Sequence, residues 1–546
     1  MIRHNLTPFL FSIIVLMQCE ISASENEGIS LKIIGDSTIY LPDYSFAGYH
    51  HGEVSIPNYT RSYNVSDYGA IPNDEKDDTQ GIITAIAEAS KEKGTTVVKF
   101  SPGKFILKKI IFIERSNFVL QGSGSDSNGT IIYCPTPLRD LPLPKEMEEL
   151  NQYLLANNKR DKKTGKIFSP FSWTGGLIWV QKKESRPHRY LATFDKTELQ
   201  LASVDNGKRG SNYFTVKNVK SINENLLAKL LWFNRSGPQS SLLRHMYGDG
   251  DFFIGSHHWN YPERALIEQI LTIKKIQNDR IYIIEPLLHD VKNDWGTILA
   301  PADLLTEVGI EKLRIEFPQT NYGGHHLEEG YNAIYISSLA NSWVRDVNVI
   351  NSDNAILSDD CAFITIQNLE VSGRAGHYGL HLGKSNHMLA KNIVIDSPMV
   401  HSISANTKAK ANVFYNIDIL QNPTIDQHCG SNHQNLFDNI RVNVNSPDFH
   451  LFKHGGAGYW KPTHGKYNTF WNIAINFDFD KSEIDTVVVK GVNDGPSAYL
   501  VGLYSNDFPI RLEYGPNAYF ESINQPPISV KSLYEYQFNQ RLSINK

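Results

Sequence analysis

One short sequence motif recurs between Gly330 and Ile473 and constrains the fold more than any other feature of the chain. Each copy has an Asn or Asp, an aliphatic residue, any residue and then a second aliphatic residue. The copies begin at Asp346, Asn368, Asn392, Asn416, Asn439 and Asn472. The first five start about 22, 24, 24 and 23 residues apart and the last about 33 residues later, a repeat length that indicates stacked structural units.

Each repeat holds one short alternating segment rich in β-branched residues, as expected of a strand. No helical pattern separates these segments, so the usual βαβ crossover does not fit. Coils of about two dozen residues that contain strands and tight turns are typical of a right-handed parallel β-helix. Asn suits the turns, because it tolerates left-handed backbone and can hydrogen-bond to neighbouring coils. We therefore predict an all-β solenoid.

The N-terminus has the pattern of a secretory signal peptide. Arg3 and His4 precede a mostly apolar run over 9–17, and the small residues of 22–24 come before a polar start at Glu25. The run is too short to span a bilayer, and no later stretch is long enough, so no membrane span is expected. We predict a secreted protein. Anchoring through a lipid on Cys19 is less favoured, because Gln18 is a poor neighbour for a lipoprotein cysteine.

The remaining composition limits the classes of partner. Beyond Cys19 only Cys134, Cys361 and Cys429 remain, and an odd number argues against a disulfide framework. The formal net charge is −5, which gives no reason to expect nucleic acid as a partner. We expect a monomer whose stability comes from the stacking of its coils.

Residues 65–105 carry a recognisable N-terminal motif. Val65-Ser66-Asp67-Tyr68-Gly69-Ala70 and Asp77-Asp78-Thr79 precede an amphipathic helix, which is followed by Gly94-Thr95-Thr96 and Pro102-Gly103-Lys104-Phe105. This text resembles the N-terminal cap of the pectate-lyase-like β-helix superfamily, which includes polysaccharide lyases, polygalacturonase-like glycoside hydrolases and phage tailspikes. The resemblance implies a helix that plugs the open end of the apolar bore, and it implies little about the reaction.

Changes in pattern along the chain suggest six regions. From about Pro135 to Pro301 the repeat is interrupted by a charged helical pattern and then by short strands, an interval too long for a simple loop. We predict a signal peptide at 1–24, a leading segment at 25–60, the cap and first coils at 61–134, a mixed insertion at 135–301, the main coils with an active groove at 302–480, and a C-terminal capping segment at 481–546. The leading and capping segments are expected to cover the ends of the bore.

Residues one coil apart should stand in a column, and spacing therefore predicts which polar side chains gather. Asp353, His377, His401 and Asp426 follow one another at steps of about 24, 24 and 25 residues. Histidines at solenoid turns can simply hydrogen-bond to backbone carbonyls. A structural ladder would more simply use Asn, as this chain does elsewhere, so the column favours a functional groove.

A second column, again at steps of about 24 residues, holds Asp360, Lys384 and Lys408. Residues 373–411 contain five Lys or Arg residues and a single Asp in an otherwise acidic chain, together with four His residues. A local basic patch of this kind suits a polyanion that lies along the helix axis. We therefore expect an anionic polysaccharide as the partner, contacted by Lys384, Asn406, His381, His428 and Asp360.

A polysaccharide lyase needs a group that neutralises a uronate carboxylate, a base, and an acid for the leaving oxygen. Three candidates for neutralising the carboxylate are Arg374, Asn406 and Lys408. The base would be His377 or His401, oriented by Asp353 or Asp426, and the proton donor would be Tyr378. All of these residue types occur in one window of the sequence, which favours a lyase.

Two alternatives remain open. A glycoside hydrolase needs two carboxylates, and Asp359-Asp360 followed by Gly376-His377 is similar in order to the polygalacturonase-like pattern. The Asn-Thr-Asp and Arg-x-Lys of that pattern are missing here, which puts the hydrolase assignment in doubt. A non-catalytic carbohydrate-binding β-helix would instead need aromatic platforms, for which Tyr459, Trp460 and Trp471 are candidates.

The sequence contains no recognised metal-binding motif. Asp426 and His428, with His433 nearby, have suitable ligand types, but their spacing matches no zinc signature. Calcium is compatible with carboxylates and a uronate. His325-His326 with Glu328-Glu329 lie in a loop between coils, where contact with the substrate and plain surface exposure are equally expected.

Overall fold

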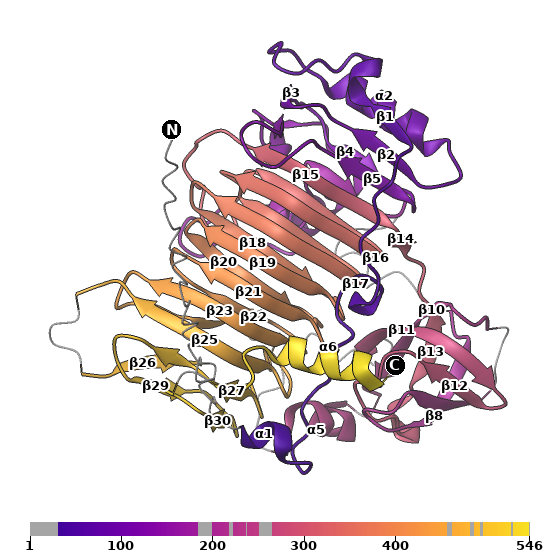
Figure 1. Cartoon of the computed structure of the whole chain (residues 1–546), viewed down its shortest axis with the longest axis vertical. Helices are drawn as coiled ribbons and strands as arrows, with labels where there is room; N and C mark the ends of the chain where they lie inside the picture. Colours follow the sequence, from indigo (N-terminus) through magenta and orange to yellow (C-terminus); the bar gives the residue numbers. More distant parts are fainter. Residues whose placement is uncertain are drawn as a thin grey trace, which may run out of the picture.

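The computed structural model describes residues 31–183, 199–217, 222–235, 237–249, 265–455, 461–480, 485–491, 495–525 and 528–544. The predicted signal peptide, Cys19, Tyr459 and Trp460 lie outside these ranges. Within them, no helix is both long and apolar enough to cross a membrane. The chain forms a long parallel solenoid with a small barrel packed against its side (Figure 1).

The solenoid is a 22-stranded sheet in which every strand pairing is parallel. Its N-terminal strands are β1 (Ser62–Asn64), β2 (Thr96–Lys99), β3 (Gly103–Ile106), β4 (Ile111–Ile113), β5 (Phe118–Gln121), β6 (Thr130–Tyr133) and β7 (Ile178–Val180). Its central strands are β14 (Leu305–Thr306), β15 (Val308–Glu316), β16 (Asn332–Ile350), β17 (Asn354–Ser372), β18 (Gly376–Gly383), β19 (Leu389–Asp396), β20 (Met399–Asn406), β21 (Val413–Ile419) and β22 (Ile425–His428). Its C-terminal strands are β23 (Leu436–Val444), β24 (Phe452–Gly455), β25 (Thr469–Phe477), β27 (Tyr499–Val501), β28 (Tyr504–Ser505) and β30 (Tyr519–Glu521). The predicted parallel β-helix is confirmed.

The repeated Asn positions form a continuous ladder along the solenoid. Each has a positive φ, between 52° and 55° for the six copies. Asn368 donates to Asp346 at 2.7 Å and Asn416 donates to Asn392 at 2.7 Å, so neighbouring coils are joined by their side chains. The predicted reason for Asn at this phase, a left-handed turn with hydrogen bonds between coils, is confirmed.

Aliphatic residues from successive coils fill the bore. Ile356, Leu380, Ile403 and Ile425 are in register across β17, β18, β20 and β22, and all are fully buried. On another face of the bore, the rings of Phe414, Phe437 and Phe470 stack with centroids 4.9 and 5.0 Å apart. Stacking like residues one coil apart gives each layer the same close packing.

The N-terminal end is closed by helix α2 (Thr79–Ser90), as the resemblance implied. Its buried side chains, among them Ile82 and Ile86, join the same core as Phe105 and Leu120. Asp78 anchors the helix start, because its two carboxylate oxygens accept from the backbone N–H groups of Ile71 and Ile106, each at 2.8 Å. The short helix η2 (Val65–Tyr68) packs beside α2.

The interval predicted as an insertion, from about Pro135 to Pro301, contains two excursions separated by strand β7 of the solenoid. Strand β7 pairs in parallel with β4 and β16, so the chain returns to the solenoid after the excursion that carries η3 (Leu138–Asp140), α3 (Lys145–Ala156) and η4 (Pro170–Ser172). The insertion proper is a closed antiparallel barrel of β8 (Ala202–Gly207), β9 (Tyr213–Lys217), β10 (Leu227–Phe233), β11 (Ala265–Gln277), β12 (Arg280–Ile283) and β13 (Ile298–Pro301). It also carries η5 (Gly237–Gln239), α5 (Ser241–Tyr247) and η6 (Asn293–Trp295).

The barrel packs against the turns that follow β18, β20 and β22. Ile270 of β11 exchanges two hydrogen bonds with the Asn386 side chain, at 3.2 and 2.9 Å. His289 of the barrel lies 2.7 Å from His433 of the solenoid, ring nitrogen to ring nitrogen. The barrel therefore covers one end of these strands, and the opposite end remains outside it.

The two terminal segments differ from their expected positions. Helix α6 (Leu533–Ile544), whose predicted cap is present as a Ser532 Oγ bond to the Glu535 N–H at 3.1 Å, lies on the flank of the solenoid with Trp471 and Leu436 (Figure 1). The leading segment, with α1 (Lys32–Gly35) and η1 (Tyr49–Gly52), packs on the same flank. Near the C-terminal end, β26 (Val487–Lys490) and β29 (Ile510–Glu513) form a separate parallel pair whose Val487, Val489 and Ile510 join the core.

Candidate functional site

The column predicted from spacing, Asp353, His377, His401 and Asp426, is not a single row of residues in register across the paired strands. His377 donates its backbone N–H to the Asp353 carbonyl, but His401 pairs with Tyr378 and Asp426 pairs with Ser404. The step between coils shortens to 23 and then 22 residues along these strands, so equal spacing does not give equal register. The side chains nevertheless converge: the rings of His377 and His401 lie 5.3 Å apart between centroids, and His401 Nδ1 lies 3.5 Å from Asp426 Oδ1, although Asp426 shares the row of Ser404.

His377 is oriented by a carboxylate that differs from the predicted one. Its Nδ1 lies 3.0 Å from Glu328 Oε1, and neither side chain is exposed. Glu328 is held in turn by the Tyr322 hydroxyl at 2.7 Å, the backbone N–H of His326 at 3.0 Å and the Ser172 hydroxyl. The loop between β15 and β16 thus inserts a fully engaged carboxylate behind the His377 ring.

A second imidazole–carboxylate pair lies on the next coils. Asp426 accepts from the Ser404 hydroxyl at 2.6 Å and lies 2.9 and 3.0 Å from His428 Nδ1. The side chain of His428 is 12% exposed, whereas Asp426 is wholly buried. His401 Nδ1 lies 3.5 Å from Asp426 Oδ1, on the inner side of the pair. Asp426 therefore orients His428 directly and faces His401.

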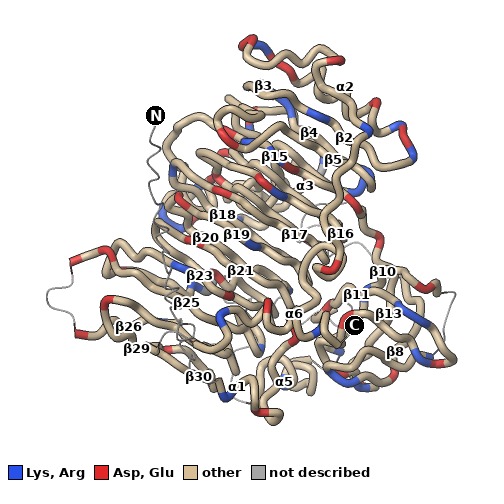
Figure 2. The backbone as a smooth tube through the Cα atoms, viewed as in Figure 1, with Lys and Arg blue, Asp and Glu red and all other residues tan. Residues whose placement is uncertain are grey.

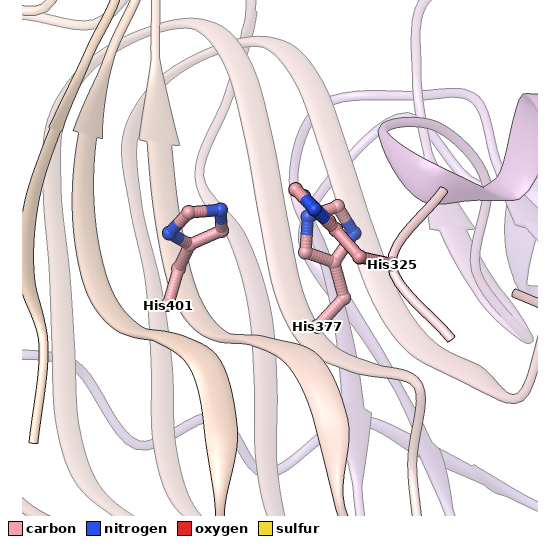
Figure 3. A group of neighbouring side chains, drawn as sticks. All are labelled: His325, His377 and His401. Atoms are coloured by element: carbon pink, nitrogen blue, oxygen red, sulfur yellow. The ribbon is translucent and has the colours of Figure 1, made fainter. Parts of the chain in front are cut away.

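The two pairs are joined by a cluster of neighbouring aromatic rings, here called the ring cluster: His325, His377, Tyr378, His401 and His428. Tyr378 contacts His377 at 4.1 Å and His401 at 4.8 Å between ring centroids. His401 contacts His428 at 4.8 Å, and the exposed His325 covers His377 at 4.7 Å (Figure 3). Burial lowers the pKa of His401 well below its ordinary value, and the neighbouring His428 and His377 act in the same direction. His401 is therefore a neutral imidazole at pH 7.

Asn406 and His381 border the ring cluster, as the sequence placed them. The Asn406 side chain donates to the Tyr378 hydroxyl at 3.3 Å, and the His381 ring lies 4.9 Å from the Tyr378 ring. Both side chains are buried. They contact Tyr378 and are covered from solvent in this conformation, so they support the ring cluster from behind.

Arg374 and Asp353 form a buried ion pair beside the ring cluster. Arg374 donates to Asp353 Oδ1 at 2.8 Å, while Asp353 Oδ2 accepts the backbone N–H groups of Gly330 and Tyr331 at 2.8 and 2.9 Å. This pair fixes the end of the loop that carries Glu328. Arg374 was predicted to neutralise a substrate carboxylate and Asp353 to orient a histidine, and the structure gives both a positioning role instead.

The predicted lysine column lies at the other end of the strands. Lys384 and Lys408 follow the ends of β18 and β20, and both reach Glu268 of the barrel, at 3.4 and 2.9 Å. Asp360 pairs with Lys229 of the barrel at 2.9 Å. Seven residues of strand separate Lys384 from His377, a span of roughly 23 Å. The two predicted columns therefore do not line one groove. Lys384 and Lys408 of the basic patch pair with the barrel instead.

The paired aspartates of the hydrolase alternative do not act together. Asp359 accepts from the Tyr335 hydroxyl at 3.3 Å, while Asp360 turns to Lys229. Figure 2 shows Lys and Arg segments interspersed with Asp and Glu segments along the solenoid, without a large region of one sign. This distribution gives no support to a broad polyanion track.

Sequence reasoning left open whether His325 and Glu328 contact the substrate or lie at the surface, and it did not single out Lys453. Lys453 of β24 is in register with Asp426 and is partly exposed. The signal for the first two was the clustering of His325-His326 and Glu328-Glu329 in one loop between coils. No periodicity places such a loop, because it lies between the repeats.

Comparison with known proteins agrees with the fold. Residues 62–136 match a family described as rhamnogalacturonase A/epimerase, pectate lyase-like. The resemblance stated for residues 65–105 is thereby confirmed for that part of the chain. No curated protein sequence matches the chain.

Solved structures with a similar fold are distant in sequence. The tailspike protein gp49 from Pseudomonas phage LKA1 is 10% identical, with a TM-score of 0.43 over 84% of this chain and 78% of that chain. DFA-IIIase from Arthrobacter chlorophenolicus A6 in complex with DFA-III is 10% identical, with a TM-score of 0.33 over 85% and 94%. The mannuronan C-5 epimerase AlgE4 A-module from Azotobacter vinelandii is 9% identical, with a TM-score of 0.33 over 85% and 96%.

Proposed function

We propose that this protein is a polysaccharide-cleaving enzyme and that the ring cluster is its active site. The observation that carries the proposal is the presence of two imidazole–carboxylate pairs, His377 with Glu328 and His428 with Asp426, on either side of the buried His401. Carboxylates that orient imidazoles are the arrangement required for proton transfer in general acid–base catalysis. The pectate-lyase-like match over 62–136 supports a carbohydrate substrate.

The reaction that we favour is β-elimination on a uronic acid unit of an anionic polysaccharide. A base removes the proton from C5, next to the carboxylate, and the electron pair of that bond forms the C4=C5 double bond. The C4–O4 bond breaks at the same time, and the leaving oxygen takes up a proton. The enzyme must therefore supply a base, a proton donor and a positive group for the carboxylate.

We assign the base to His428. Its Nδ1 is held by Asp426 at 2.9 Å, which leaves Nε2 to accept a proton, and its side chain is partly exposed. His377 and His401, the bases predicted from spacing, are fully buried. The imidazolium formed on His428 can return its proton to the leaving oxygen if both lie on one face of the sugar. No separate donor is then needed, and Tyr378 positions the rings.

The positive group among the exposed side chains is Lys453. It is in register with Asp426 on the adjacent coil, which places it beside His428. Arg374, Lys384 and Lys408 are not available for this role, because they are committed to Asp353 and Glu268.

The decisive experiment is incubation of the purified protein with pectic, alginate, glycosaminoglycan, ulvan and fucoidan polysaccharides. We expect near-UV absorbance from an unsaturated uronate and product masses without added water. New reducing ends with added water and no absorbance would overturn elimination while retaining cleavage. Absence of any cleavage across the panel would overturn the enzymatic proposal.

We also propose that the protein is secreted as a monomer. The N-terminal pattern of a charged start, an apolar run and small residues before Glu25 supports export. Mass analysis of protein recovered from outside the cytoplasm should give a chain that begins near Glu25. A chain that retains Met1 there, or one that carries lipid on Cys19, would contradict cleavage by a secretory signal peptidase.

A further inference from the structure

Three histidines from three separate segments meet at one edge of the ring cluster (Figure 3). His325 comes from the loop between β15 and β16, His377 from β18 and His401 from β20. One ring nitrogen of each lies within 4.8 Å of a ring nitrogen of each of the others. Distant parts of the sequence thus place three imidazole donors around one point.

His401 supplies an independent observation. It has no exposed surface, and neither of its ring nitrogens has a hydrogen-bond partner among the residues that the structure describes. Its nearest carboxylate oxygen, on Asp426, lies 3.5 Å away, which is beyond normal hydrogen-bond length. A buried polar group without a partner is unfavourable, so this ring is in place for a ligand that the described residues do not provide.

Glu328 completes the arrangement around His377. Its Oε1 lies 3.0 Å from Nδ1 of His377, and the contacts of Glu328 with Tyr322 and the His326 N–H fix its position. Histidines that bind metal ions almost always use one ring nitrogen for the ion and the other for a carboxylate, carbonyl or water. Nδ1 of His377 faces Glu328, so a metal ion would bind to its Nε2.

We propose that His325, His377 and His401 form a binding site for one divalent transition metal ion of the zinc type. Three neutral imidazoles suit Zn²⁺ and its neighbours, whereas Ca²⁺ and Mg²⁺ prefer oxygen ligands. Tetrahedral bonds of about 2.0 to 2.1 Å place the donor atoms roughly 3.4 Å apart. The rings must therefore close by about 1 Å, and the exposed loop that carries His325 permits this movement.

The ion would keep one coordination position for an external ligand. Asp426, which faces His401, is already engaged by Ser404 and His428, so the three imidazoles are the protein ligands. Three protein ligands with one open position are characteristic of catalytic metal sites. An oxygen of an acidic sugar, in particular its carboxylate, has the right chemistry for that position. This use of the ion rests on the proposed function, whereas the binding of the ion does not.

Metal binding can be measured without any substrate. The full-length purified protein, treated with a chelator and dialysed, should bind about one equivalent of Zn²⁺ in titration calorimetry. Co²⁺ in its place should give the strong visible absorption of a tetrahedral site. His325→Ala should weaken binding at least tenfold, and this variant should fold normally because His325 is exposed on a loop.

The remaining variants test the geometry. His401→Ala should abolish the Co²⁺ spectrum, and Glu328→Gln should weaken Zn²⁺ binding by about 10- to 100-fold through loss of the carboxylate behind His377. His450→Ala serves as the control, because its side chain is 71% exposed and lies in another loop. The site is overturned if wild-type protein binds no Zn²⁺ in a saturable manner, or if His325→Ala and His401→Ala bind as tightly as the control.

The outcomes separate this site from the proposed reaction. Stoichiometric Zn²⁺ binding in a protein that cleaves no polysaccharide would leave the metal site standing and overturn the function. Elimination that persists in chelator-treated protein with no bound metal would leave the function standing and overturn the use of the ion in the reaction, while the titration alone decides whether the site binds metal. Activity that is lost with the metal and restored by Zn²⁺ would support both.

Discussion

Strands β18 and β20 carry buried polar groups at both ends, and the two ends satisfy them in different ways. At the C-terminal ends, Lys384 and Lys408 meet Glu268 of the barrel. Burial raises the pKa of Glu268, but the surrounding lysines outweigh this effect and hold the pKa well below its ordinary value. At the N-terminal ends, His401 is equally buried and has no hydrogen-bond partner for its ring among the described residues.

The comparison shows how to separate structural from functional polar residues in a solenoid. A buried charge with a matching partner on another element holds that element in place, as the barrel is held by Glu268. A buried ring with no such partner lowers stability and persists only where it serves another purpose. Both ends looked alike in the sequence, because periodic spacing reports the row of a residue and not its partners.

The largest expected effect is the loss of activity from a change at the histidine end. His428→Ala should lower kcat/KM by about a thousandfold, or about 4 kcal/mol, because it removes the proposed base. The unfolding temperature should also fall, because the change removes the His428 partner of the buried Asp426, so the kinetics are compared at a temperature where both proteins are folded. Steady-state kinetics and thermal unfolding on the same preparation test this, with His450→Ala as the matched control.

A near wild-type kcat/KM in His428→Ala would show that His428 is not the base. The same measurement on Lys453→Ala separates the two roles. Loss of the carboxylate contact should appear in both kcat and KM.

The next largest effect is a loss of stability from a change at the lysine end. Glu268→Gln leaves Lys384 and Lys408 without their countercharge in a buried interface, which should lower the free energy of unfolding by about 3 to 5 kcal/mol. Denaturant unfolding measures this change. Glu370→Gln, an exposed acid on β17, is the control and should be near neutral. Glu268→Gln protein of unchanged stability would show that the barrel is held by other contacts.

The sequence predicted the fold well because the fold depends on repetition. The Asn turns, the aliphatic rows and the α2 cap each follow from local chemistry that is repeated about every two dozen residues. Small differences in coil length limited how well the register between coils could be predicted. The spacing predicted that Asp426 follows His401 by one coil of about 25 residues. In the structure Asp426 is instead in register with Ser404, 22 residues earlier, and therefore lies in another row.

The candidate site could be predicted only in part, because half of it is not periodic. His377, Tyr378, His401, Asp426 and His428 come together as their residue types suggested. The carboxylate for His377 comes from a loop between coils, and the partners of the lysines come from the barrel. Neither contact leaves a spacing signal, so a sequence that indicates a groove of lysines and histidines folds into two separate regions.

The buried acid Asp438 extends the comparison, because its protonation makes stability depend on pH. Burial raises the pKa of Asp438 to about 7, although its Oδ2 accepts from Ser532 and the Tyr534 N–H at 2.7 and 2.9 Å. The folded state therefore holds a proton that the unfolded state releases near pH 4, so stability is highest below pH 4 and falls as pH rises toward 7. The expected loss between pH 5 and 7 is about 2 kcal/mol. Asp438→Asn should flatten the profile of unfolding temperature against pH, and an unchanged slope would exclude Asp438 as its source.

The smallest expected effect comes from the exposed Asn ladder, where polar groups are paired but not buried. Asn416 has a φ of 53°, donates to Asn392 at 2.7 Å and accepts from Asn439 at 3.4 Å. Asn416→Ala removes these two hydrogen bonds and the two that Oδ1 accepts from the Arg441 guanidinium at 3.1 and 3.2 Å, and it strains the left-handed turn, which should lower the free energy of unfolding by about 1 to 2 kcal/mol. Asn416→Gly keeps the turn unstrained and loses only the side-chain bonds, so denaturant unfolding should place it between wild type and Asn416→Ala. Equal losses in the two variants would mean that the ladder stabilises the coils through its hydrogen bonds alone.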